Sequence, residues 1–210
     1  IGFSDGSLSL TFRIVPEERN EYKPEGNKQK MSQNRIVEGK LFVSADSLLY
    51  DSYCLGKKIL ESEFKPNYVV ALWRGGTPVG IAVQEFLAFH HVKADHIAIR
   101  TKRYDNSRVD VAHSEIVVDQ LEYIVERITP EDRLLLVDDV FDSGLSMQEV
   151  LRILQQRARC NMPKDVRLAT VYFKPERNQT DRKPDFYVHE TDAWIYFPHE
   201  LGGLSLEQIR

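Results

Sequence analysis

Apolar and polar positions follow two alternating patterns along most of the chain. Short apolar runs rich in β-branched residues predict buried strands at residues 68–72, 96–99, 133–137 and 166–173. Apolar residues that recur every three or four positions predict helices at residues 44–62, 78–89, 119–128 and 146–157. Strands that alternate with helices are typical of an α/β fold with a mostly parallel central sheet flanked by helices. Ligands of such sheets bind beyond the carboxyl ends of the strands, so we expect the candidate site there.

Several residues mark where these helices begin. Ser44 is expected to cap the first helix, and Pro78 suits the first turn of the second. Ser146 and Glu149 have the spacing of a capping box, which predicts the start of the last helix.

Two stretches show neither pattern. Residues 1–30 are rich in Gly, Ser, Asn, Pro and Lys, and we expect a disordered N-terminal extension that precedes a functional domain over residues 31–210. Residues 101–114 are polar and too many for a tight turn, which predicts a surface loop. The sequence assigns no catalytic residue to that loop.

Composition excludes several classes of protein. In 210 residues, 42% are hydrophobic and 29% charged, which excludes a chain that is disordered throughout. A net charge of −4 gives no electrostatic attraction to nucleic acid or to an anionic membrane. The longest apolar run is far shorter than the roughly 20 residues of a membrane span. Cys54 and Cys160 lack the spacing of a disulfide scaffold or a thiolate metal site, so we expect a cytoplasmic protein with free thiols.

Three carboxylates follow the apolar run of residues 133–137. Asp138 and Asp139 come directly after it, and Asp142 follows three residues later. Two adjacent acids suit sugar hydroxyls or a divalent cation. Isolated aspartates commonly just begin a turn, but three of them in this frame favour a binding site.

A turn of small residues separates these acids from the last predicted helix. It consists of Ser143, Gly144, Leu145 and Ser146. Backbone amides at the start of a helix point toward one spot, and the helix dipole favours an anion there. The turn is therefore expected to bind a phosphate group.

The segment over residues 134–146 resembles the phosphoribosyl pyrophosphate (PRPP) motif of type I phosphoribosyltransferases. The resemblance implies that the small-residue turn holds the 5′-phosphate of PRPP. It implies that Asp138 and Asp139 face the ribose hydroxyls and the Mg²⁺ bound to them. In the branch that uses 6-oxopurines, an aspartate at the place of Asp142 faces the attacking imidazole nitrogen, which implies a catalytic role. Leu145 departs from the motif, since relatives often have Lys or Gly there.

A second motif lies at the end of the first predicted strand. Arg74, Gly75 and Gly76 follow Trp73 and resemble the pyrophosphate loop of the same family, which implies that they bind the pyrophosphate of PRPP. Glycines let the backbone close on pyrophosphate without Cβ clashes, and Arg74 supplies charge. The family often has a cis peptide before the basic residue, here between Trp73 and Arg74. An Arg-Gly-Gly sequence by itself is more often only a turn.

A third cluster, residues 171–175 and 192–200, resembles the purine-binding hood of microbial xanthine- and hypoxanthine-guanine phosphoribosyltransferases. The resemblance implies that Lys174 donates to the 6-oxo group, that Trp194 stacks on the purine and that the backbone of Ile195 reads the 2-position. Glu200 takes the place of an acid associated with a second Mg²⁺. Residues 174–200 are expected to contribute most of the hood. An indole face and a cation suit a flat heterocycle that bears oxygen, although this cluster by itself would favour a buried Trp and an exposed Lys.

Together the resemblance spans residues 37–200 and implies a purine salvage phosphoribosyltransferase that uses PRPP, Mg²⁺ and a 6-oxopurine. It leaves open the choice among hypoxanthine, guanine and xanthine, and the family commonly forms homodimers or homotetramers. A regulatory protein of the same fold that senses PRPP or a nucleotide without turnover is the alternative. A phosphotransfer receiver domain also has paired aspartates at a strand end, but its pair lies near the start of the domain. Asp138 and Asp139 lie late in this chain, so the receiver domain is set aside.

Overall fold

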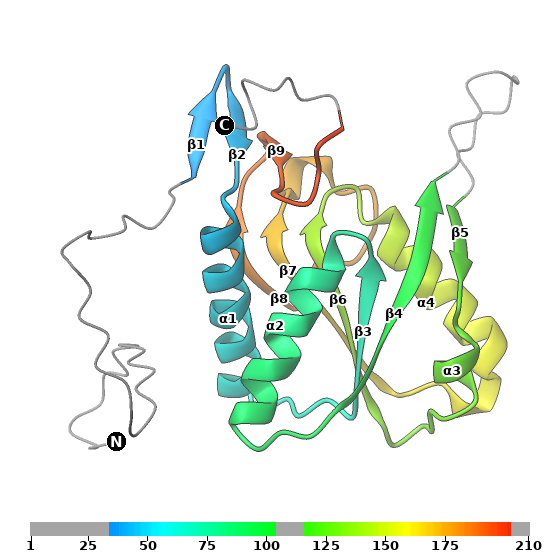
Figure 1. Ribbon diagram of the computed structural model, residues 1–210. Helices are drawn as coiled ribbons and strands as arrows, with labels where there is room; N and C mark the ends of the chain where they lie inside the picture. The colour runs from blue at the N-terminus through cyan, green and yellow to red at the C-terminus, as the bar shows by residue number, and fades with distance from the viewer. Residues whose placement is uncertain (1–33, 104–115, 203–210) are drawn as a thin grey trace, which may run out of the picture. The chain divides into compact units, whose positions relative to one another are not determined.

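A six-stranded sheet forms the centre of the protein in this computed structural model, which describes residues 34–103 and 116–202 (Figure 1). Its strands lie in the order β5 (Ile116–Asp119), β4 (Asp95–Arg103), β3 (Tyr68–Trp73), β6 (Arg133–Phe141), β7 (Asp165–Phe173) and β8 (Phe186–Glu190). Neighbouring strands are parallel except β5, which runs antiparallel to β4. The prediction of an α/β fold with a mostly parallel sheet is thus confirmed.

Helices cover both faces of this sheet, because its central strands are apolar on both sides. Helices α1 (Ala45–Glu61) and α2 (Gly76–Phe89) pack on one face, and α3 (Glu122–Val125) and α4 (Leu145–Ala158) on the other (Figure 1). In β6, Leu135 faces the first pair and Leu136 the second, and both are fully buried. Burial of each such side chain contributes about 1.5–3 kcal/mol. The continuous apolar run of β6 is therefore what a strand between two helical layers requires.

The predicted helix starts were right for α1 and wrong for α4. The Oγ of Ser44 accepts a hydrogen bond of 3.1 Å from the amide of Ser47 and caps α1. In contrast, the N-cap of α4 is Gly144, and no side chain caps this helix. The predicted capping box does not form, since the carboxylate of Glu149 binds Arg152 at 2.6 Å. Gly144 has a φ of 78°, a left-handed turn that glycine adopts readily.

The predicted loop over residues 101–114 is shorter than the pattern indicated. Strand β4 continues to Arg103, and β5, which the pattern did not predict, pairs with it from Ile116 onward. The rest of that loop, and the predicted extension over residues 1–30, lie outside the described residues. The predicted helix over residues 119–128 is observed only as α3, since Asp119 belongs to β5 and Glu126 already forms the C-cap.

A small second sheet lies beyond the carboxyl ends of the central strands (Figure 1). It consists of β1 (Arg35–Val37), β2 (Lys40–Phe42) and β9 (Trp194–Tyr196), with β2 parallel to β9. We call these three strands and residues 197–200 the hood. The sequence pattern predicted neither β1 nor β2, although these supply two of the three strands of the hood. Two 3₁₀ turns, η1 (Arg159–Asn161) and η2 (Pro175–Arg177), complete the described elements. None of the helices in the described ranges combines the length and apolar character needed to span a membrane.

Candidate active site

The small-residue turn between β6 and α4 has the shape of a phosphate cradle. A Cβ atom on Gly144 would lie 2.6 Å from the ring of Phe141 and 2.8 Å from Oγ1 of Thr180, so only glycine fits. The N-terminus of α4, whose N-cap Gly144 has no side chain, follows directly. A helix start with this geometry favours an anion such as phosphate, and phosphate binding by this turn stays a prediction.

A pocket of about 340 Å³ lies next to this turn. It is lined by Asp138, Val140, Phe141, Asp142, Ser143, Gly144, Ser146, Met147, Arg177 and Gln179. The fold thus brings the predicted phosphate-binding turn together with two of the three predicted acids. The third, Asp139, and also Leu145 are not among the lining residues.

Asp138 and Asp139 have different surroundings although they are adjacent. Asp138 is half-buried and lines the pocket. Burial, and then the neighbouring charge of Asp139, hold the pKa of Asp138 well above its ordinary value. Asp139 is 6% exposed, and its Oδ2 lies 3.0 Å from Nε2 of His199 in the hood. A carboxylate only accepts hydrogen bonds, so Nε2 carries the hydrogen.

The predicted pyrophosphate loop lies against both acids. A Cβ atom on Gly75 would lie 2.2 Å from Oδ2 of Asp139, and one on Gly76 would lie 2.4 Å from the carbonyl oxygen of Val137. Glycine is required at both positions by this close approach, and the Trp73–Arg74 peptide is cis, as the resemblance implied. Arg74 is exposed at the tip of the loop. The loop and the acids therefore form one continuous surface at the ends of β3 and β6.

Asp142 lies between two cationic side chains. Nζ of Lys174 is 3.5 Å from its Oδ2, and Nε of Arg177 pairs with its Oδ1. Lys174 is only 3% exposed, so its ammonium group is removed from water and held beside a carboxylate. An acceptor and a donor thus stand side by side at the ends of β6 and β7.

Trp194 of the hood lies above this pair. Its side chain is 54% exposed, and Nζ of Lys174 is 5.9 Å from the centre of its ring. Ile195, the next residue along β9, points the opposite way into the core and is 6% exposed. The exposed indole and the buried cation thus lie near one another, although neither Trp194 nor Lys174 is among the residues that line the pocket.

The two adjacent carboxyl groups of Asp138 and Asp139 have the chemistry of a magnesium site. Among the described residues, no three His, Cys, Asp or Glu side chains lie close enough to hold a metal ion. Mg²⁺ commonly binds one or two carboxylates and completes its shell with water and substrate phosphates, which this pair permits. Asp138 and Asp139 would hold such an ion. Glu200 is exposed and forms no such group with them, and its metal role stays a prediction.

Three residues near the site received no role in the sequence analysis. Arg177 and His199 contact Asp142 and Asp139, and the Oγ1 of Thr77 beside the glycine loop is buried without a hydrogen bond in the described part of the chain. Thr77 directly follows the glycine pair, which was a usable signal. Nothing in the sequence pointed to Arg177 or His199, since each contact joins segments far apart along the chain.

Comparison with known proteins supplies a family. The model of the phosphoribosyl transferase domain matches residues 54–205. Among solved structures, a purine phosphoribosyltransferase from Pyrococcus horikoshii is 22% identical, with a TM-score of 0.61 over 80% of this chain and 98% of that one. A Helicobacter pylori xanthine-guanine-hypoxanthine phosphoribosyltransferase is 24% identical, with a TM-score of 0.57 over 76% and 93%. A hypothetical protein from Neisseria gonorrhoeae with bound ppGpp is 22% identical, with a TM-score of 0.64 over 78% and 90%. No curated protein sequence gave a significant match.

Proposed function

This chain belongs to the phosphoribosyl transferase domain family, and on that premise we propose that it transfers the 5-phosphoribosyl group of PRPP to a 6-oxopurine. The products are a nucleoside 5′-monophosphate and pyrophosphate. The base is hypoxanthine, guanine or xanthine, and the physiological role is purine salvage in the cytoplasm. A homodimer or homotetramer remains our expectation for the assembly.

The observation that carries this proposal is the pair formed by Asp142 and Lys174. Their side-chain oxygen and nitrogen atoms lie 3.5 Å apart, and Trp194 stands beside them. An ammonium group only donates hydrogen bonds, so Lys174 suits the 6-oxo group of hypoxanthine, guanine or xanthine and disfavours the 6-amino group of adenine. The carboxylate of Asp142 accepts hydrogen bonds and therefore suits a ring N–H of the purine. The pair therefore supports 6-oxopurines as the substrate class.

PRPP is held at both of its charged ends. The turn over residues 143–146 and the start of α4 bind the 5′-phosphate, and Arg74 with Gly75 and Gly76 binds the pyrophosphate. Asp138 and Asp139 face the ribose hydroxyls and hold the Mg²⁺ that accompanies PRPP. When bound, that ion supplies positive charge beside the pyrophosphate.

The transfer exchanges one bond at C1 of the ribose for another. The attacking imidazole nitrogen forms a bond to C1 while the C1–oxygen bond breaks, and pyrophosphate leaves with that electron pair. The proton of the attacking nitrogen passes to the carboxylate of Asp142. Lys174 fixes the base, and Arg74 stabilises the charge on the leaving pyrophosphate.

The test is PRPP-dependent and Mg²⁺-dependent release of pyrophosphate with six bases offered separately. Hypoxanthine, guanine and xanthine are compared with adenine, orotate and uracil. Turnover restricted to 6-oxopurines supports the proposal and identifies the substrate, whereas turnover with adenine, orotate or uracil contradicts it.

A second candidate is a protein that binds PRPP or a nucleotide as a sensor, without turnover. The Neisseria gonorrhoeae neighbour with bound ppGpp supports this candidate, because ppGpp combines a 6-oxopurine with a 5′-phosphate group. No turnover with any of the six bases, together with measurable binding of PRPP or ppGpp, would favour the sensor.

A further inference from the structure

Arg177 makes a close but poorly directed contact with Asp142. Its Nε pairs with Oδ1 of Asp142, yet that buried oxygen receives no hydrogen bond of acceptable geometry. The Arg177 side chain is 50% exposed, in contrast to the 4% of Lys174. Of the two cations beside Asp142, Arg177 is therefore the one that can exchange its partner at low cost.

The backbone that carries Arg177 is fixed against the phosphate-binding turn. The amide of Lys174 donates to the carbonyl oxygen of Phe141 at 3.0 Å, and the amide of Gln179 donates to that of Ser143 at 3.0 Å. These two bonds flank Arg177 on either side. A movement of Arg177 is thus confined to its side chain.

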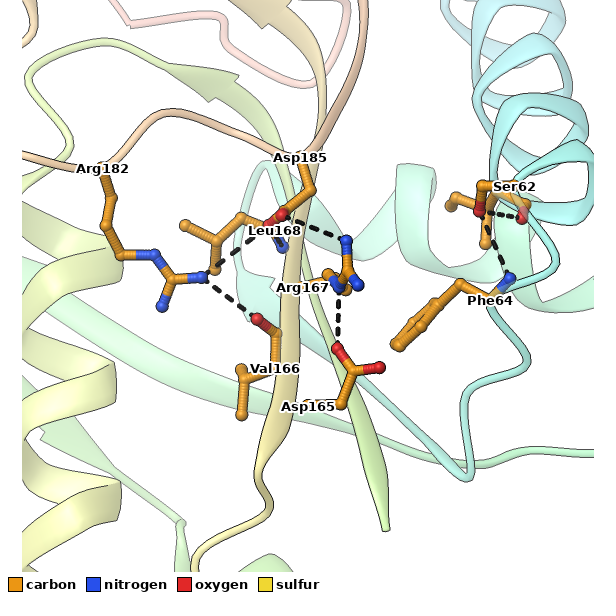
Figure 2. Close-up of polar contacts among 9 residues, drawn as sticks. Ser62, Phe64, Asp165, Val166, Arg167, Leu168, Arg182 and Asp185 are labelled. Atoms are coloured by element: carbon orange, nitrogen blue, oxygen red, sulfur yellow. Dashed lines mark hydrogen bonds and ion pairs between the residues drawn. The ribbon is translucent and has the colours of Figure 1, made fainter. Parts of the chain in front are cut away.

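Arg182 anchors the far end of the same segment. Its guanidinium group donates to the carbonyl oxygen of Val166 at 3.1 Å and lies 3.8 Å from Asp185, whose other carboxylate oxygen pairs with Arg167 (Figure 2). The segment from β7 to β8 is held at both ends.

The pocket wall has fewer basic than acidic side chains, and Arg177 is its basic residue in the described part of the chain. The lining residues in the described part of the chain include two carboxylates, Asp138 and Asp142, and one cation, Arg177. A phosphate group that enters the turn adds further negative charge beside both acids. Leu145 in that turn offers no cation, so the nearest compensating charge on the pocket wall is the guanidinium group of Arg177.

We propose that Arg177 is a phosphate-binding residue that changes partner when the pocket fills. It pairs with Asp142 in the arrangement described above, and it binds the 5′-phosphate oxygens once a phosphoribosyl ligand enters. A guanidinium group matches phosphate geometry better than the single poorly directed contact it leaves. The exchange leaves Asp142 with Lys174 alone and opens Oδ1 to the purine. This inference rests on the proposed function.

Calorimetric binding of ribose 5-phosphate tests the proposal without turnover. Arg177→Gln is expected to weaken binding about tenfold, which corresponds to the loss of one charge-assisted hydrogen bond, and Arg177→Lys less than that. Arg152→Gln is the matched control, since Arg152 is 52% exposed and also pairs with one carboxylate, Glu149, outside the pocket. It should bind ribose 5-phosphate as the wild type does.

Equal binding by the wild type and Arg177→Gln overturns the proposal. A wild-type protein that does not bind ribose 5-phosphate contradicts both this inference and the proposed function. A protein that binds it but turns over no base contradicts the enzymatic function alone, and the comparison of variants still decides the role of Arg177.

Steady-state kinetics separates phosphate binding from a role in orienting Asp142. If Arg177 binds phosphate, Arg177→Gln raises the KM for PRPP about tenfold and changes kcat less than twofold, because Asp142 is already released at saturating PRPP. A fall in kcat with an unchanged KM would overturn the proposal and make Arg177 a positioning residue for Asp142.

Discussion

Oδ2 of Asp139 lies 3.0 Å from Nε2 of His199, and this contact joins the acid pair at the end of β6 to the hood. His199 also stacks on Phe197, with ring centres 5.3 Å apart. Its Nδ1 is buried without a hydrogen bond within the described ranges. The hood is therefore connected directly to the residues proposed to face PRPP, and the elements proposed to bind the purine and PRPP share one contact.

Removal of this contact should weaken PRPP binding. His199→Ala leaves Oδ2 of Asp139 without its donor, and we expect PRPP affinity to fall about threefold to tenfold and stability to fall by about 1 kcal/mol. Calorimetry with PRPP and urea unfolding measure the two effects. His199→Gln, which can still donate from the position of Nε2, should recover much of the affinity. Wild-type affinity in His199→Ala would show that the contact has no part in binding.

Gly75→Ala should disable the pyrophosphate loop. The new Cβ would lie 2.2 Å from Oδ2 of Asp139, so the loop or the carboxylate must move. A displacement of this size at a positioned site costs about 100-fold in kcat/KM. Gly202→Ala is the control, because a Cβ there meets no atom within 4 Å. Turnover with PRPP and the preferred base is the measurement, and equal activity of the two variants would contradict the close approach.

Asp142→Asn should separate catalysis from PRPP binding. The amide cannot accept the proton of the attacking nitrogen, so kcat is expected to fall about 10²-fold or more while PRPP affinity changes far less. Asp181→Asn, an exposed aspartate, is the control. Unchanged turnover in Asp142→Asn would remove Asp142 from the mechanism.

Asp138→Asn should make the ligand-free protein more stable near neutral pH. Because the folded-state pKa of Asp138 is raised above the ordinary value of 3.8, the folded protein holds this proton to a higher pH than the unfolded chain does. Wild-type stability therefore falls as pH rises from about 4 through the folded-state pKa, and the asparagine variant lacks this loss. Urea unfolding with EDTA at several pH values measures the difference. The advantage should shrink as pH is lowered toward about 4, and a pH-independent difference would contradict the assignment.

Tyr172 should make the fold sensitive to alkali. Burial, and then the charge of Asp51, raise its pKa from 10.0 to about 12. The unfolded chain loses this proton first, so stability falls between about pH 10 and 12, by roughly 2 kcal/mol. Tyr172→Phe should lack that part of the decline in thermal unfolding, and Tyr196→Phe should retain it. Parallel declines in all three proteins would argue against a shifted Tyr172.

The central strands and helices, and the part of the candidate site between Asp138 and Ser146, could be predicted from the local sequence pattern. A strand such as β6, buried on both faces, must be apolar along its length, and an amphipathic helix must repeat its apolar residues at helical spacing. The turn proposed to bind phosphate could also be recognised from the sequence. Its small residues, the acids before it and the helix after it are consecutive, so one stretch of sequence contains both the geometry and the chemistry.

The hood and the pairing of site residues were decided by tertiary structure. Strands β1, β2 and β9 have three residues each, too few for a periodic signal, and they are stabilised by pairing such as that of Leu41 with Ile195. The capping box at Ser146 had the right residues, yet the left-handed Gly144 began the helix instead. Sequence by itself determined which residues carry charge and which small residues form the turn proposed to bind phosphate. Only the fold decided that His199 meets Asp139 and that Arg177 meets Asp142, because side chains from distant segments become neighbours only when the sheet forms.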